Sequence, residues 1–93
     1  MTKDEIDRRI DELSDGNRDV LVVFTGGEPT MQLAEDEIIG GERPKAIETN
    51  GILQPPSWIG WVTMSPKTKL DLCALRRANE IKVLYGFFED DYL

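Results

Sequence analysis

The sequence predicts a small α/β fold with about four mainly parallel strands and intervening helices. Strand-like and helix-like segments alternate along the chain, an order typical of parallel sheets with right-handed crossovers. The first strand candidate, residues 20–24, is also a continuous apolar run, as in strands of parallel sheets. With 93 residues we expect a single domain. It would comprise an outer helix over 1–14, a strand and helix core over 20–85 and an acidic tail over 86–93.

The first predicted element is an amphipathic helix over residues 2–13. Thr2 and Glu5 have the spacing of a capping box, in which the two side chains satisfy the first free amides of a helix. Ile6 and Ile10 follow four residues apart, on one face of such a helix. This segment is therefore expected to cover part of the outer surface.

The remaining elements follow in chain order. The run over 20–24 predicts a strand that is buried on both faces. After it we expect a helix over 33–39, strands over 45–48 and 58–64, a helix over 70–78 and a strand over 81–85. Four parallel strands leave two open edges, so we expect a homo-oligomer or a partner chain to cover them.

Composition and charge exclude several classes of function. The net charge of −7 disfavours nucleic-acid binding, which normally requires a basic face. The amino-terminal residues are too polar for a signal peptide, and the run over 20–24 is too short to cross a membrane, so a cytoplasmic protein is expected. Cys73 is the single cysteine and there is no histidine, so we expect no metal site built from this chain and assign no catalytic residue.

Three polar clusters follow three of the predicted strands, at residues 25–29, 48–51 and 65–67. Ligands of parallel α/β folds bind at the carboxyl ends of strands, so these clusters should meet on one rim. The sequence therefore predicts a ligand site there.

The side chains in these clusters suit a zwitterionic ligand that carries hydroxyl groups, such as an amino acid or a nucleoside. Glu28 offers a carboxylate for an ammonium group, and Lys67 offers a cation for a carboxylate. Thr25 and Thr49 add hydroxyls, and Asn50 adds an amide.

Simpler interpretations remain open for each of these features. The clusters also have the composition of ordinary turns, and Lys67 that of a solvated surface residue. Trp58 and Trp61 are expected to pack in the core, and Cys73 is expected to be a buried, inert thiol.

Read in order, the same motifs resemble a known family. The residues TGGEP at 25–29 resemble the glycine-rich motif of radical S-adenosylmethionine enzymes. The motifs that follow are similar to those of the 7-carboxy-7-deazaguanine synthase family within that superfamily: QL at 32–33, ETNG at 48–51, WVT at 61–63, SPK at 65–67 and EIKV at 80–83.

The resemblance implies a fold, a reaction and a set of contact residues. The fold would be a fragment of a partial (β/α) radical-SAM-type barrel, and the family reaction converts 6-carboxy-5,6,7,8-tetrahydropterin to 7-carboxy-7-deazaguanine. By the same resemblance, the residues assigned to S-adenosylmethionine are Gly26, Gly27, Glu28, Ser65, Pro66 and Lys67. Those assigned to the substrate are Thr25, Glu48, Thr49 and Asn50.

The sequence departs from the family at the iron–sulfur cluster. Family members bind a [4Fe–4S] cluster through a CxxxCxxC-type motif and use magnesium, and the ligands for both are missing from these 93 residues. Without the cluster no electron is available to cleave the cofactor, so we expect this chain alone to be inactive. Alternative interpretations are one half of a split enzyme that needs a cluster-bearing partner chain, an S-adenosylmethionine or nucleoside binding module, and a structural remnant.

Overall fold

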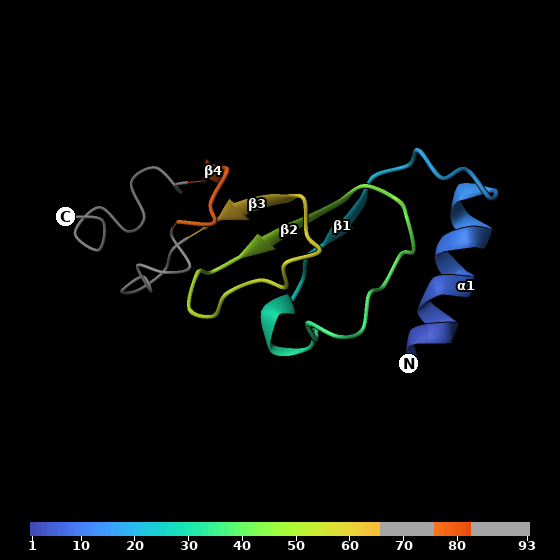
Figure 1. The fold of residues 1–93 in the computed structure, drawn as a ribbon, viewed down its shortest axis with the longest axis horizontal. Coiled ribbons are helices and arrows are strands. Elements are labelled where there is room, and N and C mark those ends of the chain that lie inside the picture. The colour runs from blue at the N-terminus through green and yellow to red at the C-terminus, as the bar shows by residue number, and fades with distance from the viewer. Residues whose placement is uncertain (66–75, 83–93) are drawn as a thin grey trace.

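The computed structural model describes residues 1–65 and 76–82. They form one α-helix, one 3₁₀ helix and four strands (Figure 1). In chain order the elements are α1 (Lys3–Ser14), β1 (Val22–Phe24), η1 (Pro29–Met31), β2 (Lys45–Thr49), β3 (Trp61–Met64) and β4 (Glu80–Ile81).

The four strands form one parallel sheet in the order β1-β2-β3-β4. Phe24 pairs with Ile47, which pairs with Val62, so these three side chains form a row on one face. The predicted α/β class with parallel strands is confirmed. The described strands make an open sheet, and the barrel implied by the resemblance stays a prediction.

One face of the sheet carries the hydrophobic core. Ile47, Val62 and Met64 are almost fully buried, and Ile59 packs with them from the segment before β3. The partly buried Trp58 packs against this cluster, as expected for a core residue, and Leu33 and Phe24 complete it. The core therefore lies between the sheet and the connecting segments on one side.

The opposite face is more open, and two predictions fail there. Val23 and Trp61 lie on that face, in register with Ala46, and are 44% and 47% exposed. The expectation that the first strand is buried on both faces is therefore wrong, because β1 is an outer strand with only one covered face. The expectation that Trp61 packs in the core is wrong for the same reason.

The predicted helix over 33–39 is replaced by η1 and an irregular loop. Seven residues are too few to form a stable helix without extensive packing. The backbone instead turns at Pro29 immediately after β1, and Ala34 uses its carbonyl to accept a hydrogen bond from Trp58 Nε1 at 3.0 Å. Leu33 packs against the core, so its apolar character reflects core contact rather than helix periodicity.

The ends of the chain's other elements differ from expectation in smaller ways. The third strand begins at Trp61, three residues later than predicted, and β4 begins at Glu80, one residue earlier. Most of the predicted helix over 70–78, the end of the fourth strand and the acidic tail lie outside the described residues.

The helix α1 begins as its capping box predicts. Thr2 is the N-cap, and its hydroxyl accepts a hydrogen bond from the Glu5 amide at 3.2 Å. However, α1 has no buried residue, and Figure 1 shows it beyond the amino-terminal ends of the strands. The helix does not contribute to the cavity at the carboxyl ends of β1, β2 and β3.

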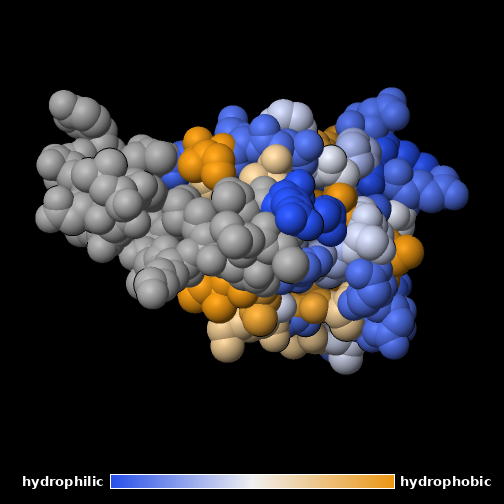
Figure 2. Space-filling view, turned by 60° about the vertical axis from the view of Figure 1, so that its left-hand side comes forward, coloured by the Kyte–Doolittle hydropathy of each residue, from blue (hydrophilic) through white to orange (hydrophobic). Residues whose placement is uncertain are grey.

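The surface combines polar and apolar regions (Figure 2). Hydrophilic side chains gather at the end of the molecule that carries α1, which has five acidic and three basic residues among its twelve. Within residues 1–65 and 76–82, no helix has the length and apolar character needed to cross a membrane.

Candidate functional site

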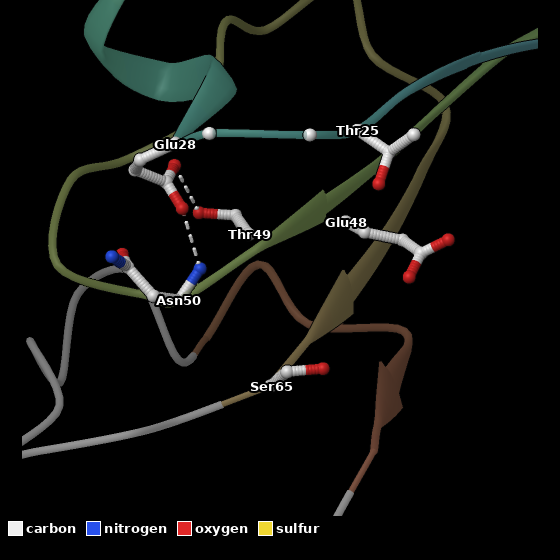
Figure 3. A pocket seen from close by; sticks show the side chains of 8 residues that line it. Thr25, Glu28, Glu48, Thr49, Asn50 and Ser65 are labelled. Atoms are coloured by element: carbon white, nitrogen blue, oxygen red, sulfur yellow. Dashed lines mark hydrogen bonds between the residues drawn. The ribbon is translucent and has the colours of Figure 1, made fainter.

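A cavity of about 490 Å³ opens at the carboxyl ends of β1, β2 and β3 (Figure 3). All three predicted polar clusters contribute to its wall. The lining residues are Thr25, Gly26, Gly27, Glu28, Glu48, Thr49, Asn50 and Ser65. The predicted meeting of the three clusters on one rim is therefore observed for their described members, while Pro66 and Lys67 lie outside the described residues.

The two glycines of the turn after β1 bring backbone to the cavity between the side chains of Thr25 and Glu28. Gly26 has φ +86°, a conformation that other residues rarely adopt, and it turns the chain away from the end of β1. Gly27 has no such backbone requirement, and a Cβ added there would meet no atom of the chain within 4 Å. The open space beside Gly27 is thus available to a ligand.

Glu28 is the most heavily hydrogen-bonded side chain in the cavity wall. Its Oε1 accepts from the Asn50 amide at 2.7 Å. Its Oε2 accepts from the Thr49 hydroxyl at 2.7 Å, from the Thr30 amide at 3.0 Å and from the Thr30 hydroxyl. The carboxylate therefore joins the turn after β1 to the end of β2, as the dashed lines in Figure 3 show for Thr49 and Asn50.

These hydrogen bonds also determine the charge state of Glu28. Burial by itself would raise the pKa of this carboxyl group, but the hydrogen bonds from Thr30, Asn50 and Thr49 outweigh that effect and lower its pKa below the ordinary value. Glu28 is accordingly ionised at neutral pH and presents a fixed negative charge at the turn.

Glu48 is the second carboxylate of the site and has a different environment. It precedes Thr49 on β2, so the two side chains point to opposite faces of the sheet, and Figure 3 shows Glu48 and Glu28 on opposite sides of β2. The Glu48 side chain is 41% exposed, and its ion pair with Lys82 is long, at 3.7 Å. This carboxylate is consequently open to solvent.

The remaining wall residues are positioned by backbone hydrogen bonds. The Ser65 amide donates to the Thr49 carbonyl at 2.8 Å, which places Ser65 beside the end of β2. Asn50 Oδ1 accepts from the Ile52 amide at 3.0 Å, which fixes the Asn50 side chain against the turn that follows β2. These contacts hold the rim in place before any ligand binds.

Sequence reasoning did not identify two residues that act on this site. Thr30 provides two of the four hydrogen bonds to Glu28, and Lys82, the residue after β4, pairs with Glu48. Lys82 lies in the EIKV motif at 80–83, but no local pattern indicates its contact with Glu48 or that of Thr30 with Glu28, because both contacts arise from how the chain folds back. Among the described residues, no group of three or more His, Cys, Asp and Glu side chains is arranged to hold a metal ion.

Comparison with known proteins supports the resemblance inferred from the motifs. The chain is 41% identical over 70 residues to a 7-carboxy-7-deazaguanine synthase of Bordetella pertussis, an alignment that covers 72% of this chain and 33% of that protein. Proteins of the same name from Nitratidesulfovibrio vulgaris and Bacteroides thetaiotaomicron are 43% identical over 67 residues and 36% identical over 88 residues. Those alignments cover 69% and 91% of this chain, and 31% and 46% of the relatives.

The predicted resemblance is therefore confirmed. The chain spans less than half the length of these curated relatives. No family model matches the chain, and no solved structure matches it significantly.

Proposed function

We propose that this chain, which is similar to 7-carboxy-7-deazaguanine synthases over most of its length, carries the S-adenosylmethionine and substrate rim of a related enzyme. Catalysis would require iron–sulfur ligands that this chain does not contain. The names of its relatives support a related function, and the rim offers polar groups that could bind the ligands.

The observation that carries this proposal is the convergence of the three strand-end clusters around one cavity. Its volume of about 490 Å³ falls in the range of about 300–1,000 Å³ typical of small-molecule sites. Exposed backbone at Gly27, hydroxyls from Thr25 and Ser65 and two carboxylates line it. Such groups suit a ligand with an ammonium group, a carboxylate and ribose hydroxyls, which S-adenosylmethionine has.

Within this proposal the two ligands use different parts of the rim. The methionine end of S-adenosylmethionine lies along the glycine-rich turn, and the substrate, 6-carboxy-5,6,7,8-tetrahydropterin, lies toward the end of β2. The cofactor set is Gly26, Gly27, Glu28, Ser65, Pro66 and Lys67, and the substrate set is Thr25, Glu48, Thr49 and Asn50.

The residues of this chain do not fit a [4Fe–4S] cluster. The family's cluster needs three thiolates from one motif, and this chain has one cysteine, Cys73, which lies outside the described residues. We accordingly assign no reaction step to this chain and propose that it is inactive alone. A cluster-bearing partner chain, or a second copy that covers the outer edges of β1 and β4, would complete the assembly.

Isothermal titration calorimetry of the purified chain with S-adenosylmethionine tests the proposal. Gly27→Ala is the most informative variant, because the added methyl group meets no atom of the chain yet occupies the space proposed for the ligand. Gly60→Ala is the matched control, since Gly60 precedes β3 at the far end of the sheet and an added Cβ there makes only an ordinary 3.5 Å contact with the Lys45 carbonyl. Lys67→Ala probes the proposed contact to the ligand carboxylate.

We expect saturable binding to the parent chain and to Gly60→Ala, with binding lost in Gly27→Ala and weakened in Lys67→Ala. Equal binding by the Gly27 and Gly60 variants would place the ligand elsewhere. No heat at millimolar ligand, from a chain shown to be folded by circular dichroism, would overturn the proposal.

A further inference from the structure

We infer that Glu28 is a positioning residue, whose carboxylate holds the glycine-rich turn against the end of β2 and does not itself bind the ammonium group of the ligand. This inference rests on the proposed function where it concerns S-adenosylmethionine. It revises the role expected from the sequence, which paired Glu28 directly with an ammonium group.

Most acceptor positions of the Glu28 carboxylate are already occupied by donors of the chain. An ionised carboxylate has two oxygens with about four lone-pair positions in total. Four donors of this chain already occupy the Glu28 carboxylate: the Asn50 amide, the Thr49 hydroxyl, and the amide and hydroxyl of Thr30. Three of these donors share Oε2, and the Asn50 amide takes one of the two positions on Oε1. A ligand ammonium group could therefore reach at most the one remaining position on Oε1 without displacing a donor of the chain.

Two of the residues that donate to Glu28 are buried. Thr30 is 8% exposed and Thr49 is 3% exposed, so water does not readily replace a hydrogen bond that either one loses. Leaving a buried donor without an acceptor is costly, which favours keeping the present arrangement when a ligand binds. The carboxylate thus belongs to the framework of the cavity.

Glu28 connects two segments that are far apart in the sequence. Thr30 lies in η1, after the turn, whereas Thr49 and Asn50 lie at the end of β2, some twenty residues later. Among the described residues, Glu28 is the side chain that hydrogen-bonds to both segments. Gly27 is adjacent to Glu28, so the same tie fixes where the exposed backbone of the turn lies relative to the rest of the rim.

Glu48, the second carboxylate of the cavity wall, has fewer hydrogen-bond partners than Glu28 among the described residues. Its carboxylate has one described partner, Lys82, at 3.7 Å, and the side chain is 41% exposed. Of the two carboxylates in the cavity wall, Glu48 therefore has more free acceptor positions for a ligand donor among the described contacts. Glu28 instead influences the ligand by holding the glycine-rich turn against the end of β2.

Amide hydrogen exchange by NMR tests the tie without any ligand. In Glu28→Gln, the amides of Thr30 and Asn50 lose their charged acceptor, and we expect both to exchange about tenfold faster or more. The amides of the core strands should keep their protection. Glu35→Gln is the matched control, because Glu35 accepts from the amide and hydroxyl of Ser57 in a similar tie outside the cavity.

Binding measurements separate positioning from direct contact. S-adenosylmethionine and its analogue without the α-amino group are titrated into the parent chain, Glu28→Gln and Glu35→Gln. Positioning predicts that Glu28→Gln weakens both ligands by the same factor, about tenfold, equivalent to about 1.4 kcal/mol. Direct contact predicts that Glu28→Gln weakens S-adenosylmethionine but leaves the analogue unaffected, because the analogue has no ammonium group to lose.

The outcomes distinguish this inference from the proposed function. Unchanged exchange of Thr30 and Asn50 in Glu28→Gln, or an effect confined to the ligand with the amino group, would overturn the positioning role. Failure of the parent chain to bind either ligand would refute the proposed function. In that case the exchange rates alone decide whether Glu28 ties the two segments.

Discussion

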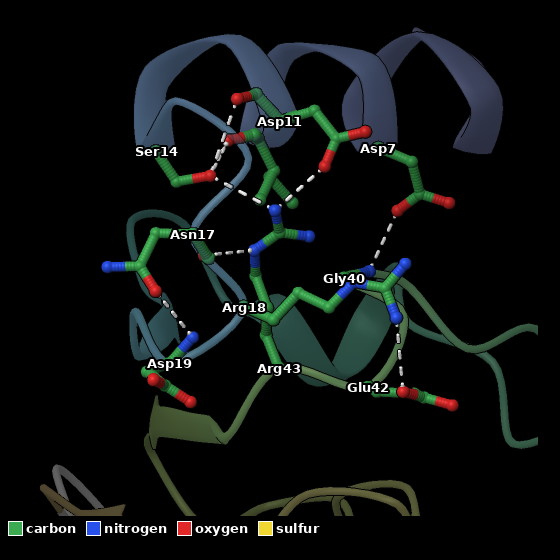
Figure 4. Close-up of polar contacts among 10 residues, drawn as sticks. Asp7, Asp11, Ser14, Asn17, Arg18, Asp19, Gly40, Glu42 and Arg43 are labelled. Carbon is green, nitrogen blue, oxygen red and sulfur yellow. Dashed lines mark hydrogen bonds and ion pairs between the residues drawn. The ribbon is translucent and has the colours of Figure 1, made fainter.

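Removal of the Arg43 side chain is expected to release α1 from the rest of the protein. One face of α1 is only partly buried, and polar contacts attach the helix to the segment before β2 (Figure 4). Arg43 is 8% exposed and donates from Nη2 to Asp11 Oδ1 at 2.7 Å and to Ser14 Oγ at 3.1 Å. Its Nε donates to the Asn17 carbonyl at 3.1 Å.

The size of the effect follows from these three bonds. A hydrogen bond from a charged donor contributes about 1.5–3 kcal/mol. The Asp11 carboxylate is 66% exposed, so water can replace Arg43 there and the ion pair contributes only about 0–1 kcal/mol. Ser14 keeps its own hydrogen bond to the Ile10 carbonyl, which further limits the loss. We therefore expect Arg43→Ala to cost about 2–4 kcal/mol in attachment of α1.

The loss should be local rather than global. Lys45 Nζ still donates to the Arg43 carbonyl at 2.8 Å, so the backbone before β2 keeps its position in the variant. Asp7 also still accepts from the Gly40 amide at 2.7 Å, which leaves α1 one contact to the loop. We expect α1 to open while the sheet stays folded.

Hydrogen exchange of the α1 amides, together with thermal unfolding, measures this prediction. The matched control is Arg18→Ala, which removes an ion pair to Glu42 at 3.4 Å in which both side chains are at least 75% exposed. We expect faster exchange along α1 in Arg43→Ala and a change within about 0.5 kcal/mol in Arg18→Ala. Normal protection of α1 in the Arg43 variant, or equal effects of the two variants, would refute the reasoning.

Three further predictions concern the core, the helix cap and pH. Ile47→Ala should lower the free energy of unfolding, measured in urea titrations, by about 3 kcal/mol, because Ile47 is fully buried. The control Ile52→Ala, at a 52% exposed position, should change it little. Similar losses in the two variants would contradict the assigned core. Thr2→Ala should reduce the stability of α1 by about 1 kcal/mol, seen as lower helical circular dichroism, and unchanged helicity would argue against the cap. The lowered pKa of Glu28 stabilises the fold at pH values above the ordinary glutamate pKa of about 4.3, and this contribution disappears as the pH falls through the lower folded value. Stability should therefore fall less steeply with acid in Glu28→Gln than in the parent chain, and parallel curves would contradict the assigned hydrogen bonds.

The sequence by itself determined the features that depend on local chemistry. The capping box at Thr2 places the start of α1, because a capping interaction involves residues three positions apart. The predicted strand segments that end at or near Phe24, Thr49 and Met64 form parallel strands in the predicted order. The polar clusters after them share one rim, because parallel strands end on the same side of a sheet.

Only the tertiary structure decided which faces are covered and which polar groups are paired. Val23 and Trp61 are as apolar as buried residues, yet they are exposed because no described segment covers their face of the sheet. The sequence predicts about two helical turns over residues 33–39, but packing of Leu33 on the core and the turn at Pro29 replace the helix.

The two carboxylates of the rim also differ in a way that only the tertiary structure determines. Glu28 lies in the turn after β1 and Glu48 lies near the end of β2, and the sequence around them does not show how many hydrogen bonds each carboxylate accepts. Within residues 1–65 and 76–82, the fold surrounds Glu28 with four donors, two of them from residues 49 and 50, and gives Glu48 one distant cation. Contacts between segments some twenty residues apart depend on the path of the chain in space, which local composition does not determine.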